Sequence, residues 1–186
     1  SYAVPSETEV QAALATAREE GQRWAALPVA ERVQAITALR RRVMARADEI
    51  VDCVVAATGK VPTEALLGEV YPVLDLLRYY EKNAPALLAR RKVPTPPLAF
   101  PFSHAYVDQR PFGVAAVVSP WNFPFQLAVI PVATALLAGN TVCLKPSELS
   151  LPVGELIADL FGQAQAFGAA LQVIPGDGDT GRHLIQ

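Results

Sequence analysis

The stretch Gly113-Val114-Ala115-Ala116-Val117-Val118-Ser119-Pro120-Trp121-Asn122-Phe123-Pro124 begins as a short apolar run rich in valine and ends in a loop held between two prolines. The chain that follows repeats this pattern of short apolar runs. Two further buried-strand patterns occur at residues 141–144 and 171–174, separated by helix-length segments at 125–138 and 151–167. Strands that alternate with helices in this way are typical of parallel sheets with right-handed crossovers. The sequence therefore predicts a doubly wound α/β sheet.

The first half of the chain follows helical patterns instead. Ser6 and Glu9 form a capping-box pattern, which predicts a helix that runs to about Ala26. Apolar residues then recur at helical spacing over residues 28–59, so we expect one second helix with a glycine at its end. A third helical stretch is predicted to begin near Pro62.

A change of composition separates the two halves. Residues 94–97 are rich in proline, and residues 98–110 alternate aromatic with polar side chains. This alternation predicts one or two extended strands. We therefore expect three segments: a helical part (1–97), extended strands (98–112) and an α/β half (113–186).

Composition and charge exclude several classes of partner. The 186 residues are 52% hydrophobic and 18% charged, which is ample material for a globular core. A net charge of −2 gives phosphodiester backbones little attraction, so we expect no nucleic-acid partner. The longest apolar run, residues 113–138, contains three prolines and is a poor pattern for a membrane-spanning helix, so we expect no membrane partner either.

The two cysteines, Cys53 and Cys143, fall in an apolar helical pattern and an apolar strand pattern. Their spacing suggests neither a disulfide framework nor a zinc site, and we expect no metal. Both are interpreted as inert core thiols rather than nucleophiles. Residues 7–23 are polar and charged, unlike a signal peptide, so these observations favour a cytoplasmic protein.

Each predicted strand of the α/β half ends in a candidate motif, and ligands of open parallel sheets collect at that edge. In the first motif, proline on either side restricts the backbone around Asn122. The Asn122 amide can donate two hydrogen bonds without titrating, which suits a developing oxyanion. The alternative is an ordinary loop in which Asn122 caps its own turn.

The second motif, Lys145-Pro146-Ser147-Glu148, places an ammonium and a carboxylate three residues apart. The two groups could form hydrogen bonds with the hydroxyls of a ribose, or they could form an exposed ion pair at the start of a helix. The third motif, residues 176–181, has the glycine spacing of a dinucleotide-binding loop. Its two aspartates would repel a pyrophosphate, so we interpret it first as a tight turn.

Taken together, the motifs resemble the NAD(P)-dependent aldehyde dehydrogenase superfamily along essentially the whole chain. The segments that carry the resemblance, in family order, are residues 110–114, 120–124, 138–142, 145–148 and 175–178. The resemblance implies a Rossmann-like, doubly wound cofactor-binding domain preceded by a helical N-terminal region. It also implies oxidation of an aldehyde to a carboxylic acid, with NAD as the hydride acceptor and a cysteine as the nucleophile.

The resemblance also assigns roles by motif. Asn122 would be the oxyanion donor. The cofactor-binding positions would be Ser119, Pro120 and Trp121 beside the nicotinamide, Lys145, Ser147 and Glu148 at the adenosine ribose, and Gly178 near the adenine. A carboxylate at position 148 favours NAD because it accepts from a free ribose hydroxyl and repels a phosphate. Lys145 could partly offset that repulsion, which leaves NADP as an alternative.

The family pattern is incomplete in this sequence, which contains no counterpart of the pyrophosphate turn, the glutamate base or the nucleophilic cysteine. We therefore expect the chain alone to be inactive, as a piece of an aldehyde dehydrogenase. The alternatives are a naturally short, non-catalytic paralogue that acts as a binding or assembly module, and an unrelated reductase that binds pyrophosphate through residues 176–181. For the complete enzyme, the resemblance implies a homodimer or homotetramer. Residues 98–112 resemble the strands through which the subunits of this family assemble.

Overall fold

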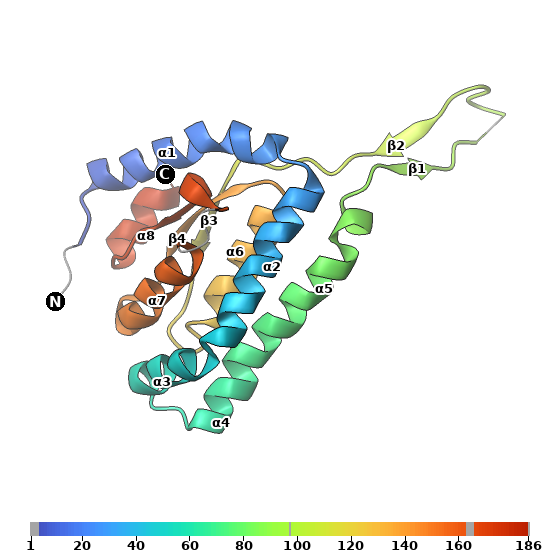
Figure 1. Ribbon diagram of the computed structural model, residues 1–186. Helices are drawn as coiled ribbons and strands as arrows, with labels where there is room; N and C mark the ends of the chain where they lie inside the picture. The colour runs from blue at the N-terminus through green and yellow to red at the C-terminus, as the bar shows by residue number, and fades with distance from the viewer. Residues whose placement is uncertain (1–3, 97, 163–165, 186) are drawn as a thin grey trace.

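The fold is a three-stranded parallel sheet with helices on both faces (Figure 1). The computed structural model describes residues 4–96, 98–162 and 166–185. The strands are β3 (Val114–Val118), β4 (Thr141–Lys145) and β5 (Leu171–Val173), in the order β3-β4-β5. The doubly wound α/β sheet predicted from the alternating pattern is confirmed, and so are all three of its strands.

The two faces of β4 contribute to different cores. Val142 and Leu144 pack under α6 (Gln126–Leu137) and α7 (Leu151–Gly162), while Cys143 points to the opposite face. That opposite face is covered by α1 (Glu7–Ala26) and by α8 (Gly178–Ile185). Successive strand side chains alternate between faces, so β4, which has helices on both sides, is buried at every position. The central strand β4 is thereby buried along its whole length, whereas β3 and β5 are partly exposed.

Helix α1 begins as the sequence predicts. The Ser6 hydroxyl accepts from the Glu9 backbone N–H, and the Glu9 carboxylate accepts in return from the Ser6 backbone N–H. This capping box satisfies two backbone donors that the first helical turn would leave without partners. The helix ends at Ala26, as predicted.

The single second helix predicted over residues 28–59 is wrong, because the structure has two. Helix α2 (Val29–Ala45) and helix α3 (Ala47–Thr58) meet at Arg46, whose φ of −112° and ψ of 22° interrupt the helical backbone. The Arg46 guanidinium bonds Glu49 within α3 and Asp159 on α7. The apolar spacing continues across the break, so the pattern alone could not reveal it. Gly59, with φ of 75°, ends α3 as predicted.

The third helical stretch contains an irregular turn that the sequence pattern does not predict. It comprises α4 (Pro62–Ala65), a π-helical turn η1 (Leu66–Val70) and α5 (Tyr71–Leu87). Such turns insert a residue into an α-helix and are often found at functional sites. Helices α2, α3 and α5 form an outer layer over α6 and α7 (Figure 1).

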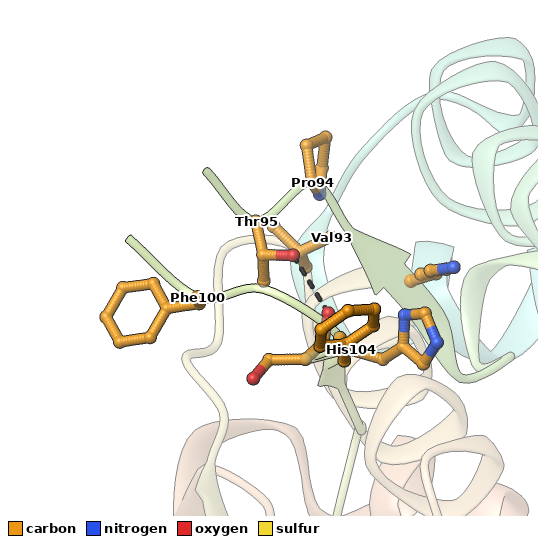
Figure 2. Close-up of a pocket in the computed structure, with 8 residues that line it drawn as sticks. Val93, Pro94, Thr95, Phe100 and His104 are labelled. Atoms are coloured by element: carbon orange, nitrogen blue, oxygen red, sulfur yellow. Dashed lines mark hydrogen bonds between the residues drawn. The ribbon is translucent and has the colours of Figure 1, made fainter. Parts of the chain in front are cut away.

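A two-stranded antiparallel hairpin projects from this body (Figure 1). It pairs β1 (Arg91–Val93) with β2 (Ala105–Val107). Only β2 lies within the predicted strand segment, and β1 lies in the part predicted to be helical. The three-residue β1 is defined by its pairing with β2, a contact between segments that local sequence patterns do not reveal. A hollow of about 490 Å³ lies near the hairpin tip, where the Thr95 hydroxyl donates to the Ser103 carbonyl at 3.1 Å (Figure 2).

Candidate cofactor and oxyanion site

The carboxyl ends of the three strands meet at one edge of the sheet. Val118 is paired with Lys145, and the Ser119 N–H donates to the Lys145 carbonyl at 3.0 Å. The Ile174 N–H donates to the Leu144 carbonyl at 2.8 Å, which continues the ladder just beyond β5. The three motifs that follow these strands therefore share one edge, where open parallel sheets bind their ligands.

A hollow of about 390 Å³ lies at this edge. Five of its lining residues are those that the sequence singles out for a cofactor: Ser119, Lys145, Ser147, Glu148 and Gly178. The others are Val118, Gly181, Arg182 and Ile185. Four of the nine lie on α8 at helical spacing, because positions 178, 181, 182 and 185 fall on one helix face. That spacing is the signal that could have identified Arg182 and Ile185 from the sequence.

Lys145 and Glu148 form the polar wall of the hollow. Lys145 is 4% exposed, and its Nζ donates to Glu148 Oε2 at 3.1 Å and to the Pro146 carbonyl at 3.2 Å. Glu148 lies at the rim in the 3₁₀ turn η2 (Glu148–Ser150). Its own backbone N–H, and then the Lys145 ammonium, lower the pKa of the Glu148 carboxyl. The hollow thus offers a buried cation beside an ionised carboxylate, a pair that can donate to one hydroxyl of a diol and accept from the other.

The two serines of the hollow differ in their contacts. The Ser147 hydroxyl accepts from the Leu149 N–H at 3.3 Å and so caps the turn η2. The Ser119 hydroxyl is buried and, within the described part of the chain, has no hydrogen-bond partner. Buried polar groups are normally satisfied, so an unpartnered hydroxyl in the wall of a hollow is a candidate ligand contact.

The glycine-spaced segment 176–181 is the start of a helix. Asp177 Oδ1 accepts from the backbone N–H of Asp179 at 3.0 Å and of Thr180 at 3.2 Å. The Thr180 N–H, before the other donors, holds the pKa of Asp177 below its ordinary value. Because Asp177 already occupies the first donors of α8, these amides are not free to cradle a pyrophosphate. The geometry favours a structural turn over a dinucleotide-binding loop.

Asn122 lies on the loop that follows Ser119, together with Pro120 and Trp121. All three are exposed, and none of them lines the hollow. The Asn122 side-chain amide has no hydrogen-bond partner among the described residues, so it does not cap its own turn. The sheet edge therefore combines a polar hollow with an adjacent free amide donor.

Neither cysteine has the surroundings of a nucleophile. Cys143 is fully buried, and burial raises the pKa of its thiol to about 11. Burial also raises the pKa of Cys53 on α3. A reactive cysteine needs a lowered pKa and access to its substrate. The described residues also contain no group of side chains suited to a metal ion, and none of their helices has the length and apolarity to cross a bilayer.

The comparisons with known proteins agree with this geometry. The chain matches the aldehyde dehydrogenase family over residues 1–186. It is 51% identical over 176 residues to a 4,4'-diapolycopene aldehyde oxidase of a Methylomonas species, covering 95% of this chain and 33% of that protein. It is 31% identical over 180 residues to an alpha-ketoglutarate semialdehyde dehydrogenase of Haloferax volcanii, covering 97% of this chain and 36% of that protein.

Solved structures show the same fold. The Staphylococcus aureus AldH structure matches with a TM-score of 0.87 at 25% identity, over 95% of this chain and 38% of that one. Proline utilization A from Bradyrhizobium japonicum matches with a TM-score of 0.88 at 28% identity, over 98% of this chain and 18% of that one. The chain thus spans about one third of the length of the curated relatives that it matches. The chain belongs to the aldehyde dehydrogenase family.

Proposed function

We propose that residues 1–186 are the cofactor-binding part of an enzyme that oxidises an aldehyde to a carboxylic acid with NAD. The observation that carries this proposal is the hollow at the sheet edge, in which Lys145 and Glu148 present a donor and an acceptor beside the unpartnered Asn122 amide. Family membership supports the reaction class.

The residues of the hollow fit the adenosine half of NAD. Glu148 would accept from one ribose hydroxyl, and Lys145 would donate to the other. The orphaned Ser119 hydroxyl would face the cofactor where β3 ends, and Gly178 would leave room for an aromatic ring because it has no side chain. When bound, the nicotinamide would accept the hydride that the aldehyde loses.

The charge of Glu148 favours NAD over NADP. A glutamate is ionised at neutral pH, and the lowered pKa of Glu148 favours this charged form further, so the carboxylate would repel a phosphate on the ribose. Arg182, on the same hollow, pairs with Asp179, which partly neutralises it. Lys145 is engaged by Glu148 itself. The wall of the hollow therefore has little positive charge to offer a second phosphate.

Asn122 would donate to the aldehyde oxygen as negative charge develops on it. Its exposed amide is free for such a bond, and donors of this kind typically contribute ~10²–10³-fold to kcat. The nucleophile would come from another part of the complete enzyme, since Cys143 and Cys53 are both buried or half-buried with raised pKa values. Residues 1–186 alone would then bind the cofactor without turning over an aldehyde.

The nature of the aldehyde is proposed from the relatives. The 51% identical protein is named for an aldehyde of 4,4'-diapolycopene, and the 31% identical one for alpha-ketoglutarate semialdehyde. Exposed apolar side chains lie on the η1–α5 segment, including Leu67 and Tyr71. They favour the first type of substrate, because a semialdehyde that carries a carboxylate needs a cationic partner.

Assembly is proposed through the β1–β2 hairpin. Leu98 is 98% exposed and Phe102 is 102% exposed, so two large apolar side chains stand free of the body that the structure describes. Exposed apolar groups of this size are typical of subunit contacts. In the complete enzyme, Phe102→Ser should shift the mass measured by light scattering toward the monomer, whereas an unchanged mass would locate assembly elsewhere.

The activity test compares the full-length gene product with residues 1–186 alone. NADH formation from an apolar aldehyde is expected only from the full-length protein, and Asn122→Ala should lower kcat about 10²-fold without weakening NAD binding. Turnover by the short chain would refute the proposed division of roles. A full-length product that lacks turnover but binds NAD would favour the alternative, a non-catalytic paralogue.

A further inference from the structure

A buried ion pair joins the outer helical layer to the loop that carries Asn122. Glu69 lies on the π-helical turn η1 with none of its surface exposed, and its Oε1 is 2.6 Å from Lys60 Nζ. The Lys60 side chain is 10% exposed. Desolvation offsets much of the attraction within a buried pair, so such a pair is weak evidence for stabilisation alone. We therefore expect the Lys60–Glu69 pair to have a role other than stabilisation.

The other side-chain contacts that the structure describes for this pair go to the loop and to the first residue of α6. Lys60 Nζ donates to the Asn122 backbone carbonyl at 2.7 Å and lies 3.7 Å from the centroid of the Phe123 ring. Glu69 Oε2 accepts from the backbone N–H of Phe125 at 2.9 Å and of Gln126 at 3.1 Å. One partner thus holds the carbonyl of Asn122, and the other holds the amides three and four residues later.

Glu69 supplies a cap that the loop itself lacks. The first N–H groups of a helix have no partner within it and are usually capped by a Ser, Thr, Asp or Asn side chain. At the start of α6 the N-cap residue is Phe125, which offers no side-chain hydrogen bond. Glu69 takes this role from 56 residues away. The start of α6, and with it the exit of the loop, is fixed by η1.

Close packing strengthens the same connection. A Cβ placed on Gly68 would lie 3.2 Å from the Phe123 ring, which is closer than an ordinary van der Waals contact, so the missing side chain of Gly68 lets η1 pass close to the loop. A π turn changes which side chains of a helix face its neighbour, and such turns frequently occur at functional sites. Here the turn brings Glu69 to the loop.

We propose that Lys60 and Glu69 are positioning residues that hold Asn122 in place for the reaction. By fixing the carbonyl of Asn122 and the amides that follow, the pair would aim the free Asn122 side chain in one direction. This inference rests on the proposed oxyanion role of Asn122. Misplacing a reacting group by about 1 Å can lower a rate on the order of 10²-fold.

The first measurement is amide hydrogen exchange in residues 1–186. The variant Lys60→Met/Glu69→Gln removes both charges together, which avoids leaving one of them buried and unpaired. We expect exchange at Phe125 and Gln126 to accelerate at least about tenfold, with β4 protected as before and NAD affinity within about threefold. Unchanged exchange at these two amides would show that the pair does not hold the loop.

A matched control is available in the same helical layer. Arg40 on α2 pairs with Glu81 on α5 at 2.6 Å and has no described contact with the loop. The variant Arg40→Met/Glu81→Gln should leave exchange at Phe125 and Gln126 and the kcat of the complete enzyme unchanged. An equal effect from this control would show that the Lys60–Glu69 pair only stabilises the fold in general and does not act on the loop.

The decisive test is a kinetic cycle in the full-length gene product. We expect Lys60→Met/Glu69→Gln to lower kcat about 10–100-fold at constant KM for NAD, and to cause no further loss when Asn122 is already alanine. If the kcat losses of Lys60→Met/Glu69→Gln and of Asn122→Ala multiplied when the changes were combined, the pair would not act through Asn122. If Asn122→Ala alone left kcat unchanged, the oxyanion role itself would fail, which separates the two proposals.

Two single substitutions keep the test decisive. If the double variant does not fold, Glu69→Gln is used in its place, because it leaves no carboxylate buried without a partner and Lys60 keeps its bond to the Asn122 carbonyl. It should show the same dependence on Asn122, and a loss of kcat independent of Asn122 would overturn the proposal. Lys60→Arg keeps the charge and a donor, so it should retain more of kcat than Glu69→Gln.

Discussion

Gly154 on α7 lies directly against the ring of Pro146. A Cβ added to Gly154 would come 2.5 Å from Pro146 Cγ and 2.7 Å from Pro146 Cβ, which no side-chain contact tolerates. Pro146 separates Lys145 from Ser147 and Glu148, so this helix sets the path of the backbone along one wall of the hollow. The missing side chain of Gly154 is thus linked to the geometry of the proposed ribose site.

Gly154→Ala should therefore weaken NAD binding as well as stability. The rigid ring of Pro146 cannot rotate away, so the backbone between Lys145 and Glu148 must shift, and overpacking of this kind typically costs about 1–3 kcal/mol. Titration calorimetry should show at least a fivefold weaker affinity for NAD. Gly162→Ala, at the end of the same helix, meets no atom within 4 Å and serves as the control. Equal effects of the two changes would contradict the role given to Pro146.

Glu148→Gln should reduce the preference for NAD over NADP. The change removes the carboxylate that repels a ribose phosphate, and we expect the ratio of the two dissociation constants to move about tenfold toward NADP. Glu155→Gln, an isosteric change at an exposed position on α7, should leave the ratio unaltered. Since the Glu148 pKa lies below its ordinary value of 4.5, the carboxylate stays ionised and wild-type NAD affinity should be flat from pH 8 to pH 5. Affinity that falls across this range would contradict an ionised Glu148.

The buried thiol of Cys143 should make stability sensitive to alkaline pH. Its folded pKa of about 11 lies above the ordinary 9.0, so its contribution is fully present below pH 9 and is lost as pH rises toward 11. The free energy of unfolding of the wild type should fall by about 2 kcal/mol more than that of Cys143→Ala over this interval. Denaturant titrations at several pH values measure the difference. Parallel pH profiles for the two proteins would refute it.

Asn140 should matter more for stability than its place at a helix end suggests. Its Oδ1 accepts from the N–H of Phe112 at 2.7 Å and of Gly113 at 3.1 Å, and its Nδ2 donates to the Ala135 carbonyl at 3.1 Å. Asn140→Ala would leave these partly buried groups without partners and should lower the free energy of unfolding by about 2–4 kcal/mol.

The control for Asn140 is a surface asparagine on α5. Asn83→Ala removes one hydrogen bond to the Tyr79 carbonyl, where water can replace it, so it should cost less than about 1 kcal/mol. Thermal unfolding followed by circular dichroism compares the two variants. Similar losses from both would show that the bridge between α6 and the entry to β3 is not important.

Local patterns predict those parts of the fold that local interactions determine. The capping box of Ser6 and Glu9, the three strands of the sheet and the left-handed Gly59 are specified by residues adjacent in sequence. The shared edge of the motifs follows from parallel topology, so the sequence alone is enough to place Lys145 and Glu148 at a common site.

The features that the sequence does not reveal depend on contacts between distant segments. Arg46 interrupts a helix whose apolar spacing continues unbroken, and its side chain bonds Asp159 on another helix. The contact of Glu69 with Phe125 bridges 56 residues through a π turn with no sequence signature. Arg182 is missed for a local reason instead: the glycine spacing before it indicates a turn, which hides the helical spacing of α8.

The proposal that the edge hollow holds the adenosine of NAD can be tested by titrating residues 1–186 with NAD. Wild type is compared with Lys145→Met/Glu148→Gln, which removes the donor and the carboxylate together without leaving either charge unpaired. We expect measurable binding by the wild type and at least tenfold weaker binding by the variant, at an unchanged unfolding temperature. Equal affinity in the two proteins would contradict the proposal and favour binding through the segment 176–181.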